Sequence, residues 1–337
     1  MGLLWLKKNL FNTWYNAILT VVSLLAISWF GRNFLVWAFT RARWAVIGDN
    51  LRLFFVGRYP EALSWRIGVI IAIILVLGVF SLGISLDRFP RFWQKFKPWL
   101  GFLWIGAFFP IWWLLLGGFA LEPVSIDDLS GLVLTIVVSV SSIALCFPFG
   151  ILLALGRQSE LPAIRWLSTA YIEIVRGLPL IGILFLAQVM LPLILPSTVR
   201  PDRVVRAIAG FTIFAAAYLA ENVRGGLQSI PRGQIEAARA LGLNPILVLF
   251  LIVLPQALKA VIPAIVGQFI SLFKDTSLLA IVGLVDLLGM AGSILANPKF
   301  VGRYAEVYLF VALIYWIFCY SMSIAGRRLE KRLNTGR

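Results

Sequence analysis

The 337-residue chain contains no histidine, and only 13% of its residues are charged. Without histidine, His-based acid–base catalysis, Ser-His-Asp triads and His-Glu zinc motifs are excluded. No lysine is preceded by glycine and followed by serine or threonine, so the chain has no phosphate-binding P-loop and does not hydrolyse ATP itself. We therefore expect no catalytic residue, no bound metal and no cofactor.

Cysteine is also scarce. Cys146 and Cys319 each lie inside an apolar run, and two such residues imply no disulfide framework. The chain is instead rich in apolar residues: 61% of its residues are hydrophobic, and the mean hydropathy is +0.93. Soluble domains are about half apolar and a quarter charged, so this composition indicates a membrane protein.

The net charge of +15 is best explained by lysine and arginine in cytoplasmic loops, and we expect no nucleic-acid partner. Lys7 and Lys8 precede an apolar run without a small-x-small cleavage site, which is typical of an uncleaved signal anchor.

The hydropathy pattern predicts an all-α polytopic protein with eight spans, because a spanning helix needs roughly 20 mostly apolar residues. The expected spans are Ala17–Trp37, Ile67–Leu86, Leu100–Leu121, Leu132–Leu155, Leu178–Leu195, Ala207–Ala220, Ile246–Phe273 and Val307–Ala325. The seventh contains Pro255, Lys259 and Pro263, and we expect its first part, up to about Lys259, to lie at the interface. A further apolar stretch, Leu278–Ala296, carries Asp286 and several glycines, and predicts a partial or re-entrant segment packed inside protein.

Charge distribution orients these spans. With both termini cytoplasmic, most basic loops and the basic tail fall inside, while the acidic stretch EPVSIDDLS falls outside. One segment, Arg32–Arg66, is arginine-rich yet external. Within it, Asn50–Tyr59 fits either an amphipathic helix lying in the membrane interface or an ordinary long loop. Composition divides the chain into a tryptophan-rich three-helix extension, residues 1–121, and a five-helix core, residues 122–337.

The stretch Gln234–Pro255, QIEAARALGLNPILVLFLIVLP, begins with a half-polar segment in a chain that is otherwise strongly apolar. Ile235, Ala238 and Leu241 share one face at helical spacing. Gly242 can end that helix in the left-handed conformation, and Asn244-Pro245 can begin the next. A helix of about three turns is too short to be stable alone in water, so we expect it to dock on another protein.

The same residues resemble a family signature. Glu236-Ala237-Ala238, three residues, Gly242, nine residues, Ile252, one residue and Leu254-Pro255 match the cytoplasmic EAA loop of permease subunits of ABC importers. Tyr171–Leu180, Ala217–Gln234 and Leu272–Leu284 are similar to the polar amino-acid branch of that family, and the tryptophan-rich extension is most like the M-type permease of general L-amino-acid importers. The chain departs from that branch at Leu178 and Asn222, and either position can bear on substrate choice.

The resemblance implies an inner-membrane permease that pairs with a sister permease, two ATPase subunits and a periplasmic amino-acid-binding protein. Its coupling loop is residues 225–245, and the residues expected to contact or position the ATPase are Gly233, Glu236, Ala237, Ala238, Arg239, Gly242, Ile252, Leu254 and Pro255. The family's function is ATP-driven import of polar L-amino acids, with hydrolysis in the partner. The residues alone leave open a self-sufficient secondary transporter or channel, and a membrane enzyme or scaffold.

Polar residues inside the spans are candidates for the substrate pathway, because ionised groups there are costly and usually paired or functional. We expect Glu173 to pair with Arg176, and Glu221 to pair with Arg224. Glu221 and Asn222 could alternatively face the pathway and bind the amino group of a substrate. Lys274-Asp275-Thr276 predicts a self-paired turn or a substrate gate. Gln188 and Gln268 fit either hydrogen bonds between helices or substrate contacts.

Overall fold

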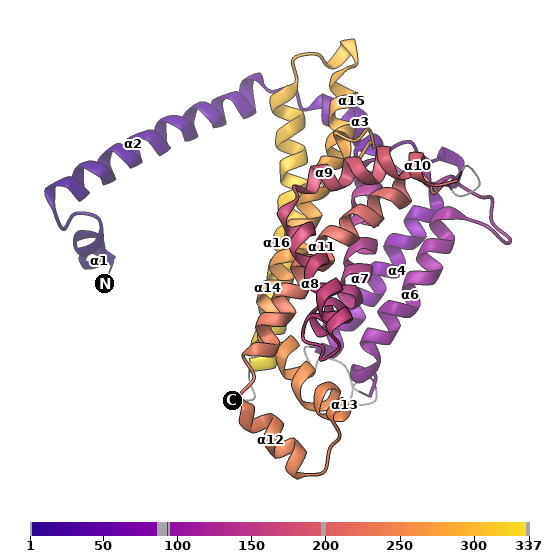
Figure 1. Ribbon diagram of the computed structural model, residues 1–337. Coiled ribbons are helices and arrows are strands. Elements are labelled where there is room, and N and C mark those ends of the chain that lie inside the picture. Colours follow the sequence, from indigo (N-terminus) through magenta and orange to yellow (C-terminus); the bar gives the residue numbers. More distant parts are fainter. Residues whose placement is uncertain (1, 86–92, 94, 197–199, 335–337) are drawn as a thin grey trace.

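The computed structural model describes residues 2–85, 93, 95–196 and 200–334, and within them the chain is built of helices (Figure 1). The β contacts in these ranges are two isolated bridges, Gly118–Leu121 and Gly131–Asp286. A bilayer offers no water to the backbone, and helices satisfy their own N–H and C=O groups. The predicted all-α polytopic fold is confirmed.

The helices follow the apolar runs of the sequence. The N-terminal part contains α1 (Gly2–Asn9), α2 (Trp14–Val36), α3 (Ala45–Phe55), α4 (Trp65–Ser85) and α6 (Leu100–Leu116). The rest contains α7 (Gly131–Arg157), α8 (Pro162–Gly177), α9 (Leu180–Phe185), α10 (Leu191–Ile194), α11 (Arg203–Gln228), α12 (Arg232–Ala240), α13 (Pro245–Leu247), α14 (Leu254–Asp275), α15 (Leu287–Leu295) and α16 (Tyr304–Asn334).

Within the described ranges, six helices are long and apolar enough to cross a membrane. The pair formed by Pro162–Gly177 and Leu180–Ile194, bent by 106°, adds a seventh candidate. Helix α6, with 17 residues, is at the short end of the spanning range and adds an eighth. These candidates correspond to the eight predicted spans. The predicted end of the second span, Leu86, lies outside the described residues.

The apolar stretch Leu278–Ala296 does not form a full span. Helix α15 has nine residues, a length of about 14 Å at 1.5 Å per residue. Its cap, Asp286, is fully buried and accepts hydrogen bonds from the backbone N–H groups of Leu288 and Gly289 and from the Tyr315 hydroxyl. The predicted partial segment packed inside protein agrees with this arrangement.

The arginine-rich segment Arg32–Arg66 contains helix α3, which packs against this subunit on one face. Helix α3 buries Val46 and Phe54 in one apolar cluster with residues of α15 and α16, including Met290 and Val311. Asn50–Phe55 are thus helical, as the first interpretation of Asn50–Tyr59 expected, and the residues after them form a turn; the position of this segment relative to the membrane stays a prediction. The last turn of α3 also lies close to the start of α7. Gly131 there adopts φ +62, and a Cβ added to it would lie 2.8 Å from the carbonyl oxygens of Leu53 and Phe54.

Helix α2 extends away from the bundle, and none of its residues is buried (Figure 1). Together with the π-helical turn Trp37–Arg41 it is long and apolar enough to cross a bilayer. A helix that is apolar on all sides belongs in lipid or against another membrane helix. The packing surface of α2 therefore lies outside the described part of this subunit.

Helix α11 is the centre of the core, where it packs along α7 on one side and α14 on the other. Small residues allow this close approach. A Cβ added at Gly226 would lie 2.5 Å from the carbonyl oxygen of Ala257 on α14, and Ala216 and Ala220 are buried. Helices α11 and α14 are therefore held tightly together, and the cavity described below lies between them.

Candidate functional site

Helix α12 stands at one end of the molecule, apart from the bundle (Figure 1). It follows Pro231 and ends before Gly242, which adopts the left-handed φ of +79. The Asn244 side chain then accepts a hydrogen bond from the N–H of Leu247 at 2.9 Å and begins the next helix. The predicted helix stop and cap are confirmed.

The two faces of α12 differ in exposure. Ala238 is buried in a cluster with Val248, Leu254 and Ala257, and this contact holds α12 against the start of the following helix. Glu236, Ala237 and Arg239 are exposed, as is Gly233. Among the described residues, neither Glu236 nor Arg239 takes part in an ion pair.

Leu241 departs from the expected inner face, because 82% of its surface is exposed. It lies beyond the last turn of α12, where the chain has already left helical geometry, so the spacing rule that placed it beside Ala238 no longer applies. An apolar side chain thus stands beside the exposed charges.

Beyond the loop, the chain continues as one long helical segment, Pro245–Ala280. Ile252 is half-buried, Leu254 is buried and Pro255 is exposed. Pro255 lacks an N–H, and the turn before it, Val248–Val253, is a π-helix. The helix therefore continues through the proline, and the interfacial position of its first part, up to about Lys259, stays a prediction.

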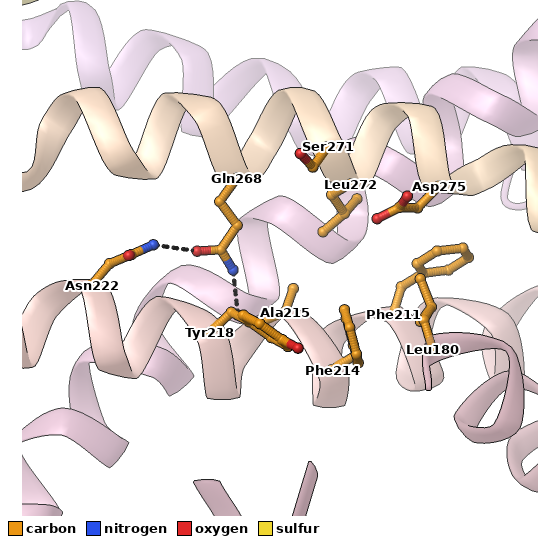
Figure 2. A pocket seen from close by; sticks show the side chains of 10 residues that line it. All are labelled: Leu180, Phe211, Phe214, Ala215, Tyr218, Asn222, Gln268, Ser271, Leu272 and Asp275. Atoms are coloured by element: carbon orange, nitrogen blue, oxygen red, sulfur yellow. Dashed lines mark hydrogen bonds between the residues drawn. The ribbon is translucent and has the colours of Figure 1, made fainter. Parts of the chain in front are cut away.

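A cavity of about 330 Å³ lies among α9, α11 and α14 (Figure 2). The Asn222 Nδ2 donates to Gln268 Oε1 at 2.7 Å, and Gln268 Nε2 donates to the Ala215 carbonyl at 2.6 Å. The rings of Phe214 and Tyr218 lie 4.8 Å apart between centroids. The lining residues are Leu180, Phe211, Phe214, Ala215, Tyr218, Asn222, Gln268, Ser271, Leu272 and Asp275.

Three of the predicted pathway residues, Asn222, Gln268 and Asp275, line this cavity. Figure 2 shows Asn222 and Gln268 at one end and Asp275 at the other. Because Gln268 and Asp275 are seven residues apart on α14, these ends are separated by about 10 Å along the helix.

The other predicted pathway residues lie elsewhere. Gln188 is buried in the π-helical turn Leu186–Met190, where its Nε2 donates to the Arg203 carbonyl at 2.7 Å. Thr276 is buried and its hydroxyl donates to the Phe273 carbonyl, while Lys274 is exposed. No ion pair joins Lys274 to Asp275 in the described part of the chain, so the turn is not held by the expected self-pairing.

Glu221 lies in a cluster of charges that joins α7, α8 and α11. Arg157 donates to Glu221 at 2.7 Å and to Glu173 at 2.8 Å, and Arg224 donates to both carboxylate oxygens of Glu221. Arg176 lies 3.5 Å from Glu221 and 5.6 Å from the centroid of the Tyr218 ring. The Glu221–Arg224 pair is confirmed.

The predicted Glu173–Arg176 pair is wrong. Both residues belong to α8, and each reaches a different neighbouring helix instead, because those helices present partners that spacing within α8 does not reveal.

Sequence reasoning missed the aromatic wall of the cavity. The sequence does contain a pattern for this wall, because five lining residues of α11 stand at positions i, i+3, i+4, i+7 and i+11 of one helix face: Phe211, Phe214, Ala215, Tyr218 and Asn222. The residues of α14 recur in the same way. Neither stripe identifies by itself which helix it faces.

Comparisons with known proteins agree with this geometry. Residues 146–335 match the family described as "Binding-protein-dependent transport system inner membrane component". The chain is 42% identical to the Escherichia coli "Inner membrane amino-acid ABC transporter permease protein YhdY", over 100% of this chain and 94% of that protein. It is 35% identical to the Rhodobacter capsulatus "Glutamate/glutamine/aspartate/asparagine transport system permease protein BztC", over 98% and 93% respectively.

Among solved structures, the "Crystal structure of an amino acid ABC transporter with histidines" aligns with a TM-score of 0.54 and 29% identity, over 60% of this chain and 92% of that chain. The matched family residues include the EAA loop, the cavity and the whole charged cluster around Glu221. The chain therefore belongs to the binding-protein-dependent inner-membrane transport components, and it is a permease subunit of an amino-acid ABC importer.

Proposed function

We propose that α12 is the element through which a separate ATPase drives this permease. The exposed face of α12 presents Glu236 and Arg239, and the residue after the helix presents Leu241, for a groove on the ATPase, while Ala238 fixes the helix to its own subunit. Charged groups on the rim and one apolar anchor are what a docking helix of this size offers a partner.

The observation that carries this proposal is the continuous helix behind the loop. The segment that begins at Pro245 runs without interruption to the cavity residues Gln268 and Asp275. From Pro245 to Asp275 it covers about 45 Å at 1.5 Å per residue. A displacement of α12 therefore reaches the cavity wall through one stiff element.

The cavity is the proposed passage for the amino acid. Its volume of about 330 Å³ is at the lower end of small-molecule sites, which run from about 300 to 1,000 Å³. Aromatic walls with a few polar groups are typical of such sites. Asn222, Gln268 and Asp275 supply the polar groups. Glu221, Gln188 and Thr276 instead support the helices around them, and Lys274 is exposed.

We further propose a complex with a sister permease, two ATPase subunits and a periplasmic binding protein, with both termini in the cytoplasm. The unpartnered surface of α2 supports assembly with another membrane subunit. Charge supports the orientation: Arg232 and Arg239 belong to α12 and Arg328 to the last part of α16, whose C-terminal end lies near α12 (Figure 1), whereas the acidic Asp127 and Asp128 belong to the turn that precedes α7.

A cysteine cross-linking experiment tests the docking role. Glu236→Cys, in the assembled transporter with ATPase subunits purified in mild detergent, is expected to cross-link to the ATPase, and the yield is expected to change when ATP is added. Asp127→Cys, an exposed residue preceding α7 rather than following α11, is the matched control and is expected to remain unlinked. An unlinked Glu236→Cys in a complex that retains its ATPase would contradict the proposal.

A further inference from the structure

The lining of the cavity has an uneven charge. Among the lining residues that the structure describes, Asp275 is the sole carboxylate, and none is a lysine or an arginine. The charged cluster around Glu221 contains three arginines, but none of them lines the cavity. The lining itself therefore presents one negative charge, while the two nearby positive charges, Arg176 against the Tyr218 ring and Lys274 next to Asp275 in the chain, do not line the cavity.

The exposed neighbour Lys274 acts on Asp275 electrostatically but makes no direct contact with its carboxylate in the described part of the chain. Asp275 is half-buried at the end of α14, and within the described residues its carboxylate makes no hydrogen bond and no ion pair. An unpaired carboxylate in a spanning segment is costly unless it serves a ligand. Figure 2 shows Asp275 on the same side of the cavity as Ser271 and Leu272, facing the aromatic residues of α11.

The rest of the lining offers an aromatic ring face and hydrogen-bond donors. The face of Phe214 can attract positive charge, whereas the Tyr218 ring already has the Arg176 guanidinium 5.6 Å from its centroid. One N–H of Asn222 and one of Gln268 are already committed to partners within the protein, whereas Asn222 Oδ1 has no hydrogen-bond partner among the described residues. The second N–H of each amide and the hydroxyls of Tyr218 and Ser271 remain as donors for the α-carboxylate of a substrate.

We propose that the cavity selects amino acids by the charge of their side chain, with Asp275 receiving the substrate ammonium group. Amino acids with neutral or cationic side chains are bound in preference to those with a side-chain carboxylate. This inference rests on the proposed role of the cavity as the substrate passage. A second substrate carboxylate would enter a desolvated space that already holds the charge of Asp275, and repulsion is strong where the dielectric is low.

Matched amino-acid pairs test this selectivity without the binding protein. The complete transporter, purified in detergent, is titrated with glutamine and glutamate, with asparagine and aspartate, and with arginine, and its thermal midpoint is recorded. We expect glutamine, asparagine or arginine to stabilise it at concentrations at least about tenfold lower than glutamate or aspartate, a difference well within the energy of one close charge pair. Asp275→Asn is expected to remove most of this discrimination, and Asp275→Glu to retain it.

Two further variants separate the inference from the proposed function. Asp49→Asn removes an exposed carboxylate of α3 that pairs with Lys299 and does not line the cavity. This variant is expected to leave the discrimination unchanged. Ser271→Trp fills the cavity from an exposed position on α14 and is expected to abolish stabilisation by every amino acid.

If Ser271→Trp abolishes stabilisation but glutamate and glutamine act equally on the unaltered transporter, the charge inference is overturned and the passage stands. If stabilisation survives Ser271→Trp, or if no amino acid stabilises the unaltered transporter, the passage itself is overturned and the charge inference with it.

Discussion

Replacing Glu221 by glutamine removes one negative charge from the junction of α7, α8 and α11. The carboxylate accepts hydrogen bonds from Arg157 and Arg224, lies 3.5 Å from Arg176, and its side chain is only 16% exposed. Hydrogen bonds to charged groups contribute about 1.5–3 kcal/mol each, and breaking a buried ion pair costs about 3–5 kcal/mol. The three arginines are 23–36% exposed, so water screens part of the interaction, and we expect a loss of about 2–3 kcal/mol.

Glu173→Gln is the matched control. Glu173 shares Arg157 with Glu221, but it is 56% exposed, and Arg157 is its one ion-pair partner among the described residues. Exposed ion pairs contribute about 0–1 kcal/mol, so the control is expected to lose no more than that. The free energy of unfolding is measured for both variants by SDS titration in mixed micelles, followed through tryptophan fluorescence. Equal losses for the two variants, or a smaller loss for Glu221→Gln, would refute the assignment of Glu221 as the centre of the cluster.

Two other substitutions test close packing. Ala238→Leu overfills the contact between α12 and the following helix and is expected to cost about 1–3 kcal/mol, whereas Ala237→Leu on the exposed face should stay within about 0.5 kcal/mol; an equal effect in the same titration would show that α12 is not held there. Gly131→Ala places a Cβ 2.8 Å from two carbonyl oxygens of α3 at a positive φ, and a loss of more than about 1 kcal/mol is expected. Gly48→Ala, with no atom within 4 Å of its Cβ, should be neutral or stabilising, and a Gly131→Ala protein as stable as Gly48→Ala would argue against tight docking of α3.

Local chemistry made the α12 loop predictable. Gly242 tolerates a left-handed turn, Asn244 accepts from the N–H groups of the next helix, and Pro245 suits a first turn, and each effect acts within four residues. Prediction failed one residue beyond the regular helix, at Leu241, because periodicity assigns a face only while the helix continues.

Contacts between distant segments were not predictable in the same way. Glu173 and Arg176 are three residues apart, which favours a pair on an isolated helix, yet Arg157 and Glu221 offer stronger partners from other helices. The residues around Asn50 have the pattern of an amphipathic helix, and the structure shows that Val46 and Phe54 on its apolar face pack against α15 and α16. A single chain's pattern shows that an apolar face must be buried, but it does not say against what.

The amino-acid sequence by itself determined the class of this protein, its eight apolar segments and the position of the EAA loop, because hydropathy, helix capping and motif spacing are local features of the chain. Only the tertiary structure decided that Asn222, Gln268 and Asp275 line one cavity while Glu221, Gln188, Lys274 and Thr276 do not. The physical reason is that a cavity is made by the relative rotation of α11 and α14, and that rotation is set by small residues such as Gly226 where the two helices touch.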